Sequence, residues 1–426
     1  MERFKLRQKS RTAILGGGLT GLSAAFHLKQ AGKEFLIFEK EEKAGGLAGS
    51  FSINKFSFDY TGHFLHFKTC YGREFIKKLL KNNLTRNLRK ASVFADYEYI
   101  PYPFQVHFAK LKNRAIVAEC KKGLEKPEIR KEYKTFKEWL LGTSGRGIYK
   151  HFMAPYNEKL YQCKLDKLLP FGTSAYVPEL QKKKKNYGYN FKFFYPAGGA
   201  IEKLPEALEA LVFDRTLLSA EVKGIDPVKR EIIYGQDRKA GGFTDIISTL
   251  PLPELIRLIK GAPENVRTAA KKLKYISVFA LNLGIGRERI NKNHWLYFAD
   301  PKISFYRVGF YSNVSRKLCP PLTSSLYAEV SIKKGERFDK NKVAEKIKKD
   351  LIATGVLKKY DSIIAEQALF IKYAYVVFDL DYKKNLEILR KYLNEIKIIS
   401  TGRYGGWNYS AMEDAILDGK KAARLS

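Results

Sequence analysis

The chain has 426 residues, enough for two or three domains with a sizeable core, and 45% of them are apolar, as in ordinary globular proteins. No apolar run approaches the roughly 18 residues that a membrane-spanning helix needs, so we expect no integral membrane segment. The formal charge of +34 is extreme, but the lysines are spread along the whole chain without a known nucleic-acid-binding module, so we expect no nucleic-acid partner.

Residues 12–40 predict a strand, a glycine-rich turn, a helix and a second strand. Gly16 permits a tight turn, Gly18 lets the backbone approach a pyrophosphate, and Gly21 lets the helix pack against the strand. The N-terminus of the helix supplies unpaired N–H groups for phosphates. Glu39 ends the second strand, where a carboxylate accepts hydrogen bonds from ribose hydroxyls. The segment therefore predicts a dinucleotide site.

A second glycine pair follows shortly after the acidic residue. Gly45 and Gly46 come just beyond Lys40 and just before Leu47. A second pair at this place is typical of flavoproteins that bind FAD and not of NAD dehydrogenases. We therefore expect the ligand to be FAD, with these four residues among those that contact it.

The middle of the chain changes from mixed to helical character. Residues 71–83 predict an amphipathic helix, and residues 92–104 predict a strand that ends in a turn broken by proline. From about 105 to 180 apolar residues recur at helical spacing, with glycine and proline breaks. The lysine-rich stretch 182–189 predicts an exposed, mobile loop.

The remaining segments return to strands. Residues 194–250 have α/β character, with strands around 220–225 and 231–234 and a buried strand at 245–250. Residues 275–330 alternate β-branched and aromatic residues with polar ones, which predicts an antiparallel sheet. A strand at 397–400 precedes a glycine-rich turn at Gly402 and a final helix. This last segment resembles one that returns to a flavin-binding domain.

We therefore expect the α/β class, with a discontinuous Rossmann-type FAD-binding domain, a helical insertion and an antiparallel substrate domain. The expected bounds are 1–95, 191–250 and 395–426 for the FAD-binding domain, 104–190 for the helical substrate-side domain, and 272–394 for the antiparallel sheet.

Cysteine and histidine usage indicates neither a metal site nor an oxidising compartment. The four cysteines lie far apart, and the six histidines form no metal-binding motif. The basic N-terminal stretch lacks the apolar region of a secretory signal. We expect free thiols, no metal and a cytoplasmic location, and the sequence leaves a homo-oligomer open.

Six segments in order along the chain carry a more specific pattern. They are Gly62-His63, 100–105, 152–157, 294–298, 305–307 with 312–313, and 402–409. Together they resemble the FAD-dependent UDP-galactopyranose mutases, especially the eukaryotic-type branch. The resemblance covers nearly the whole chain. The flavin segments alone are shared with amine oxidases and protoporphyrinogen oxidases.

The resemblance implies an isomerase that feeds cell-surface glycan synthesis. In such a mutase the N5 atom of reduced FAD attacks the anomeric carbon of the sugar and expels UDP. The flavin–sugar adduct opens through an iminium and recloses as a furanose, with no net redox change. Only the reduced flavin is active, so the resemblance also implies an external reductant such as NADPH or NADH.

The resemblance also assigns roles to residues of this sequence. His63 would lie beside the flavin ring and tune N5 through its backbone carbonyl, and Arg307 would neutralise the diphosphate, so these two are the catalytic candidates. The substrate-binding candidates are Tyr102 and Gln105 for uracil, Trp139 and Asn157 on the helical side, and Tyr297, Tyr375 and Tyr409 with Arg307 for the diphosphate or sugar. The cofactor-binding candidates are Gly16, Gly18, Gly21, Glu39, Lys40, Gly45, Gly46, Leu47, Val222, Gly402, Arg403, Met412 and Glu413.

The chain departs from the family pattern at three places. Ala154 stands where the family has a phosphate-binding arginine, Val314 where it has a tyrosine, and residues 412–415 replace an Asn-Gln-Asp-His run. Lys150 or Lys159 could supply the missing charge. One alternative is an FAD oxidoreductase of the amine oxidase or protoporphyrinogen oxidase type. Another, motivated by the charge of +34, is a non-catalytic flavoprotein or a basic binding module. Each aromatic candidate is equally consistent with a place in the core.

Overall fold

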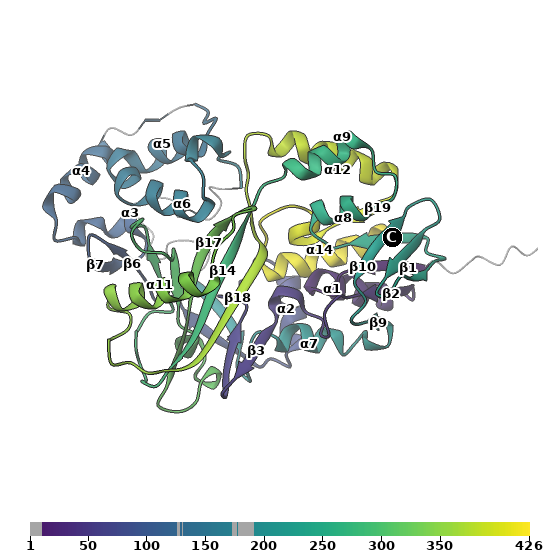
Figure 1. Cartoon of the computed structure of the whole chain (residues 1–426), viewed down its shortest axis with the longest axis horizontal. Helices are drawn as coiled ribbons and strands as arrows, with labels where there is room; N and C mark the ends of the chain where they lie inside the picture. The colour runs from purple at the N-terminus through teal and green to yellow at the C-terminus, as the bar shows by residue number, and fades with distance from the viewer. Residues whose placement is uncertain (1–10, 126–127, 130, 173–176, 178–190) are drawn as a thin grey trace, which may run out of the picture.

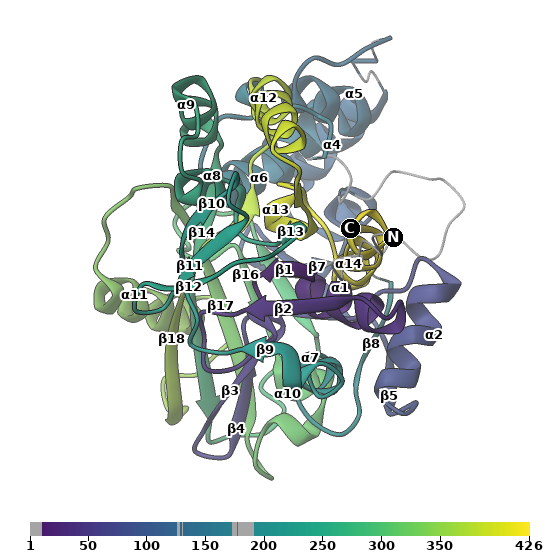
Figure 2. The same ribbon diagram turned by 90° about the vertical axis from the view of Figure 1, so that its right-hand side faces the viewer.

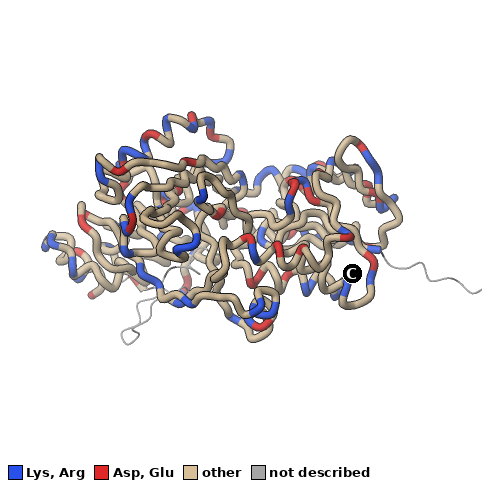
Figure 3. Tube along the Cα trace, turned by 90° about the horizontal axis from the view of Figure 1, so that it is seen from below, with Lys and Arg blue, Asp and Glu red and all other residues tan. Residues whose placement is uncertain are grey.

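The computed structural model describes residues 11–125, 128–129, 131–172, 177 and 191–426 (Figure 1). The loop predicted at 182–189 lies outside the described residues. Within them, no helix is both long and apolar enough to span a bilayer. Lys and Arg are distributed over the whole trace and do not gather on one element (Figure 3).

A five-stranded parallel sheet carries the glycine-rich turn. Its strands, in sheet order, are β19 (Ile398–Ser400), β13 (Asp245–Ser248), β1 (Arg11–Leu15), β2 (Glu34–Phe38) and β9 (Thr216–Leu217). β1 is central and pairs in parallel with both β2 and β13. Ala13, Ile14 and Leu15 are fully buried, as expected for a parallel sheet with both faces covered.

The two ends of the chain meet in this sheet. β19 pairs with β13, and helix α1 (Leu19–Gln30) packs against helix α14 (Met412–Leu425) (Figure 2). Ser23 Oγ donates to the carbonyl of Ile416 at 2.7 Å, and a Cβ at Gly419 would overlap the carbonyl oxygen of Thr20. The predicted meeting of the first and last segments is confirmed.

A second sheet of seven strands forms the other large layer. Its strands, in sheet order, are β18 (Ile363–Val376), β14 (Tyr275–Ile285), β17 (Ser324–Lys333), β16 (Arg307–Gly309), β15 (Trp295–Phe298), β6 (Ala91–Ala95) and β7 (Glu98–Pro101). All pairs are antiparallel except β6 with β15. The sheet therefore extends beyond the predicted range 272–394, because β6 pairs with the edge of β15 and satisfies its backbone N–H and C=O groups.

Four helices form a separate lobe above the end of this sheet (Figure 1). They are α3 (Phe104–His107), α4 (Arg114–Glu125), α5 (Phe136–Ile148) and α6 (Ala154–Tyr161). A capping box starts α5, where Thr135 Oγ1 accepts from the N–H of Glu138 and the Glu138 carboxylate accepts from the N–H of Thr135. A π-helical turn at Tyr149–Met153 joins α5 to α6.

Smaller elements fill the space around the two sheets. The helix predicted over 71–83 is α2, which begins at Cys70 and ends at Leu79, because Lys81 and Asn82 have positive φ. The other elements are β3 (Ser50–Ile53), β4 (Phe56–Asp59), β5 (Leu84–Leu88), β8 (Lys192–Pro196), α7 (Lys203–Glu209), β10 (Val222–Asp226), β11 (Glu231–Tyr234), β12 (Arg238–Ala240), α8 (Leu252–Leu258), α9 (Glu264–Lys272), α10 (Tyr311–Val314), α11 (Lys340–Ala353), α12 (Tyr382–Glu395) and α13 (Gly402–Gly405).

Candidate functional site

One cavity of about 2070 Å³ extends from the glycine-rich turn of β1 to the seven-stranded sheet and the helical lobe. Nineteen of the sequence candidates line it: Gly16, Gly18, Glu39, Lys40, Gly45, Gly46, Leu47, His63, Tyr102, Gln105, Asn157, Val222, Tyr297, Arg307, Tyr375, Gly402, Arg403, Tyr409 and Met412. Segments that are far apart in the sequence therefore share one continuous space.

Two glycine turns meet at one end of the cavity. The N–H of Gly45 donates to the carbonyl of Gly17 at 2.8 Å, and Gly18 forms a bridge with Gly45. A Cβ on Gly46, which has φ +58°, would lie 3.3 Å from Cα of Gly18. A Cβ on Gly21 would overlap the carbonyl oxygen of Gly16, so Gly21 shapes the turn from behind the cavity. Leu19 and Thr20 at the start of α1 line the same cavity, so the N–H groups of the first helical turn can meet a phosphate there.

Glu39 lies at the same end and is almost fully buried. One carboxylate oxygen accepts from the N–H of Gly17 at 2.6 Å, and the other accepts from the N–H of Glu41 at 3.0 Å. Burial raises the pKa of Glu39, and these two N–H groups oppose that shift. The remaining lone pairs can accept hydroxyl groups of a ligand.

His63 lies at the middle of the cavity in the segment that follows β4. Its Nδ1 atom is buried and has no hydrogen-bond partner among the described residues. Burial lowers the pKa of His63 to about 4, and the nearby charges of Arg403 and Arg307 add to that shift. The imidazole is therefore neutral at physiological pH, and its unpaired nitrogen can meet a polar group of a ligand.

Arg307 and Glu329 lie opposite each other on β16 and β17 and both line the cavity. Nη2 of Arg307 donates to Oε1 of Glu329 at 2.8 Å, and Nε donates to Oε2. The Glu329 side chain is 1% exposed. Because both contacts use the Nε and Nη2 edge of the guanidinium, the Nη1 group lies outside the pair.

Aromatic rings form the wall between the second sheet and the helical lobe. Tyr102 stacks on Tyr297 with ring centroids 4.8 Å apart, and Tyr156 meets Tyr297 edge-on at 5.6 Å. Nε1 of Trp295 donates to the Tyr297 hydroxyl at 2.9 Å, and the guanidinium of Arg89 lies 4.6 Å from the Tyr102 ring centre. Flat rings next to a cationic group suit an aromatic base.

The facing wall combines tyrosines with a second arginine. Tyr375 and Tyr409 are stacked at 5.7 Å, and the guanidinium of Arg403 lies 4.4 Å from the Tyr409 ring centre. Arg403 donates to the carbonyls of Ser410 and Ala374 at 2.7 and 2.9 Å. The backbone therefore holds Arg403 in place, and its charge remains near the cavity.

Three candidates lie outside the cavity lining, namely Gly21, described above, Trp139 and Glu413. Trp139 stacks on Phe136 at 5.9 Å within the apolar core of the helical lobe, because its position on α5 faces that core. Glu413 is buried and accepts from the N–H groups of Lys68 and Thr69 at 2.6 and 3.0 Å, ahead of the first turn of α2. The acidic side chain is thus directed at α2, where helix N–H groups favour a carboxylate.

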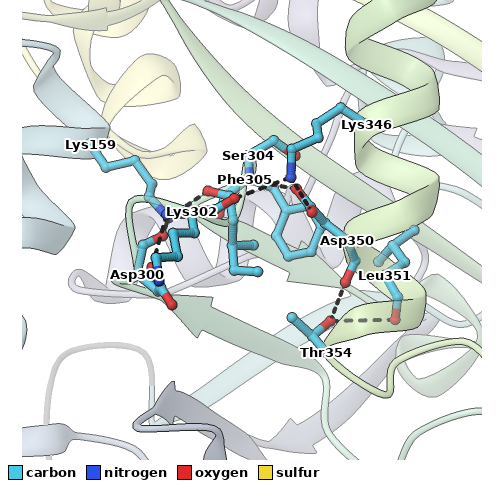
Figure 4. Close-up of polar contacts among 10 residues, drawn as sticks. Lys159, Asp300, Lys302, Ser304, Phe305, Lys346, Asp350, Leu351 and Thr354 are labelled. Atoms are coloured by element: carbon cyan, nitrogen blue, oxygen red, sulfur yellow. Dashed lines mark hydrogen bonds and ion pairs between the residues drawn. The ribbon is translucent and has the colours of Figure 1, made fainter.

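Neither neighbouring lysine replaces the arginine that the resemblance to the mutases implies at position 154. Ala154 packs beside the apolar core of the helical lobe. Lys150 pairs with exposed Glu119 at 2.8 Å, and the ammonium of Lys159 points into a loop of backbone carbonyls (Figure 4). Neither lysine lines the cavity formed by the described residues. Val314 is buried in the core.

Several lining residues were not singled out in the sequence. Glu329 could have been noticed as an acidic residue inside an otherwise apolar strand, which needs a buried partner. Tyr156 and Tyr306 belong to segments that were recognised, but nothing separated them from the other tyrosines. Among the described residues, no group of three or more His, Cys, Asp or Glu could hold a metal ion.

Comparisons with known proteins agree with this geometry. Residues 14–79 match the model of the NAD(P)-binding Rossmann-like domain. A 52-residue stretch is 36% identical to a protein of Dictyostelium discoideum named "Probable flavin-containing monoamine oxidase A", but the match covers only 12% of this chain and 11% of that protein.

Solved structures cover the whole fold. The chain superimposes on a reduced UDP-galactopyranose mutase with a TM-score of 0.90, at 23% identity, over 97% of this chain and 94% of that one. A cyclohexylamine oxidase of Brevibacterium oxydans gives a TM-score of 0.69 at 13% identity, over 98% of each chain. The chain therefore has a Rossmann-type dinucleotide-binding domain joined to a second sheet, in the fold that these enzymes share.

Proposed function

We propose that the protein is a flavin-dependent pyranose–furanose mutase that acts on a nucleotide-activated sugar of the UDP-galactopyranose kind. The observation that carries the proposal is the continuity of the cavity, which joins the dinucleotide turn at Gly16 to the tyrosines and to Arg307. A cofactor bound at the turn can thus reach a ligand held between the two tyrosine walls. The similarity in fold to the mutase structure supports the same reading.

The residues at the turn fit FAD. The two glycine turns are in contact, and Gly18 and Gly46 line the cavity without side chains, so a pyrophosphate could lie against both turns, and Glu39 can accept ribose hydroxyls. The unpaired Nδ1 of His63 is available to a polar edge of the isoalloxazine ring. Val222, Gly402, Arg403 and Met412 line the same cavity and are further candidates for contact with the cofactor. When bound and reduced, FAD would supply a nucleophilic ring nitrogen to the anomeric carbon of the sugar.

The chain's own residues would bind and orient the substrate. Tyr102 and Tyr297 offer stacked rings to the uracil, and Gln105 offers an amide to its edge. The hydroxyls of Tyr375 and Tyr409 and the Nη1 group of Arg307 would donate to the diphosphate oxygens. Neutral His63 adds no charge next to the reacting centre, so the positive potential stays at the phosphates.

The test is turnover by reduced enzyme. The purified protein should show a flavin spectrum, and after reduction by dithionite, or by NADPH or NADH as a physiological reductant, it should interconvert the ring forms of a nucleotide sugar. Oxidised enzyme should be inactive and serves as the matched control. If the reduced enzyme contracts the sugar ring of none of the nucleotide sugars in a panel, the proposal is wrong.

A second candidate is an FAD oxidoreductase of the amine oxidase or protoporphyrinogen oxidase type. Two observations favour it. The Arg307–Glu329 pair is neutral overall, and Ala154 brings no cation, so the cavity has less free positive charge than a diphosphate site with two unpaired arginines. Mixing oxidised enzyme with substrate under anaerobic conditions distinguishes the candidates. An oxidoreductase oxidises its substrate and bleaches the flavin, whereas a mutase leaves the spectrum of the oxidised flavin unchanged.

A further inference from the structure

The loop between β15 and β16 carries a concentrated set of backbone acceptors. Lys159 Nζ donates to the carbonyls of Phe298, Ile303 and Phe305 at 3.1, 2.9 and 3.3 Å, and it also donates to the carbonyl of Asp300 (Figure 4). One ammonium thus lies among four carbonyl oxygens of a single loop. An ammonium has only three N–H groups, so at least one of them is shared.

This arrangement is that of a cation among oxygen ligands. Carbonyl oxygens that point to one place need a donor or a cation, because unpaired buried acceptors are costly. Burial lowers the pKa of Lys159 to about 8, and Asp300 and Asp350 oppose that shift, so the group is protonated at neutral pH. The Lys159 ammonium thus serves as the donor and the cation for these four carbonyl groups.

The loop is also held from its other side. The N–H of Ser304 donates to Asp350 of α11 at 2.7 Å, and Lys346 donates to the carbonyl of Lys302 at 3.1 Å and to Asp350 (Figure 4). The contact with α11 joins the loop to its own sheet. The contact with Lys159 is different, because Lys159 belongs to α6 in the helical lobe.

Both ends of the loop, and α6 itself, reach the cavity. Tyr297 precedes the loop and Arg307 follows it, and the N–H of Phe298 donates to the carbonyl of Tyr306 at 3.0 Å across its base. Helix α6 presents Asn157 to the same cavity, two residues before the lysine. The ammonium therefore connects one wall of the cavity to the other.

We propose that Lys159 is a positioning residue that sets the separation between α6 and the cavity wall formed by Tyr297 and Arg307. Its ammonium does so by binding four carbonyl groups of the β15–β16 loop, those of Phe298, Asp300, Ile303 and Phe305, which we call the carbonyl cage. The inference rests on the proposed function only for the identity of the ligand held between these walls. It concerns a side chain that touches neither cofactor nor ligand and acts through the loop.

The experiment compares Lys159→Met, Lys159→Ala and the control Lys164→Ala in the full chain. Met keeps the length of the stem and removes the charge. Lys164 is an exposed lysine that follows the same helix and pairs with Glu158 at 2.9 Å, so its loss should change nothing. Amide hydrogen exchange over 298–307, flavin content and the Kd for UDP are measured for each variant.

Loss of the contact between Lys159 and the carbonyl cage should first be detected as faster amide exchange in the β15–β16 loop. Both Lys159 variants should retain flavin, exchange the amides of 298–307 at least tenfold faster, and bind UDP about tenfold more weakly. Added n-propylammonium, which replaces the atoms deleted in Lys159→Ala, should restore both properties, while the bulkier tetramethylammonium should not. Rescue of this kind separates placement of the charge from a general packing effect.

Two results would overturn the inference. Unchanged exchange over 298–307 in Lys159→Met would show that the cage does not order the loop. Faster exchange with an unaltered Kd for UDP would show that the loop does not position the ligand wall. If wild-type protein itself fails to bind UDP, the proposed function fails, and the exchange and rescue measurements still decide whether Lys159 orders the loop.

Discussion

Arg307 and Glu329 are direct cross-strand partners that form a two-point ion pair inside the cavity. A buried pair of this kind stabilises the protein only while both partners remain, since removal of one leaves an uncompensated buried charge. The Glu329 carboxylate also competes with any anionic ligand for the guanidinium of Arg307. The pair therefore links the stability of the free protein to the charge of what it binds.

Replacing Glu329 by Gln should separate the effect of the ion pair on stability from its effect on the binding of an anionic ligand. The amide keeps one acceptor for the guanidinium but removes the negative charge, so Arg307 gains attraction for phosphate oxygens. We expect the free variant to lose about 3 kcal/mol of unfolding free energy, and its Kd for UDP to fall about tenfold. Denaturant unfolding and calorimetric titration check the two parts. A variant that binds UDP no better than wild type would contradict the charge competition.

Arg307→Ala should weaken nucleotide-sugar binding and leave the cofactor in place. Loss of a charge-assisted hydrogen bond of about 1.5–3 kcal/mol corresponds to a Kd that rises about tenfold to hundredfold. Equilibrium dialysis gives the Kd, and the flavin spectrum gives the cofactor content. The double variant with Glu329→Gln removes the stranded carboxylate as a control. Release of FAD from the double variant, or an unchanged Kd, would mean that Arg307 is misassigned.

Gly419→Ala should loosen the contact between the two ends of the chain. A Cβ at this position would overlap the carbonyl oxygen of Thr20, which is backbone and can move only with α1. Overpacking of this kind costs about 1–3 kcal/mol, so the melting temperature should fall. Lys421→Ala on the exposed face of the same helix should change stability by less than about 0.5 kcal/mol. Equal melting temperatures for the two variants would contradict the packing argument.

Asp59 should make stability depend on pH. Its fully buried carboxyl accepts from Ser50, Tyr195 and the N–H of Ile201, and burial raises its pKa from the usual 3.8 to about 7. Because the pKa of Asp59 is higher in the folded than in the unfolded protein, its contribution to the free energy of unfolding is complete below pH 3.8. This contribution is lost as the pH rises through about 7. A shift of this size corresponds to about 4 kcal/mol.

The variant Asp59→Asn tests this dependence. Unfolding free energies measured by denaturant between pH 5 and 8, in the range where Asp59 titrates, should show a smaller decline with rising pH for Asn than for Asp. The histidines titrate with the opposite sign and are common to both proteins, so the difference isolates Asp59. Parallel curves would indicate that the carboxyl keeps an ordinary pKa.

The dinucleotide turn could be predicted from the sequence because its signal is local. Gly16, Gly18 and Gly21 act through backbone conformation and close approach, and both depend on residues within one strand–helix unit. The return of the last segment was also predictable, since a strand, a glycine and a helix recur there in the order of the first unit. The helix predicted over 71–83 differs from α2 mainly at its C-terminal end. There α2 stops at Leu79, because Lys81 and Asn82 have positive φ.

The substrate side was less predictable because it depends on partners far apart in the chain. Trp139 looks like Trp295 in a sequence, yet the first packs inside the helical lobe and the second donates to Tyr297 at the cavity. Lys159 lies two residues from Asn157, but the direction of its side chain follows from the carbonyls of a loop that includes Asp300, 141 residues away. Glu329 acquires its importance from Arg307 across the sheet. Such relations exist only in the folded chain.

The pairing of α1 with α14 and of β13 with β19 also has a consequence for biosynthesis. A ribosome makes β1, α1 and β13 before residues 398–425, so the edge of β13 and the face of α1 that packs on α14 stay uncovered until those residues emerge. The glycine-rich turn can form early, but the sheet around it is completed only after residues 398–425 have been made. Until then β13 offers an unpaired edge to other strands, and this edge is the surface that a holdase chaperone would protect.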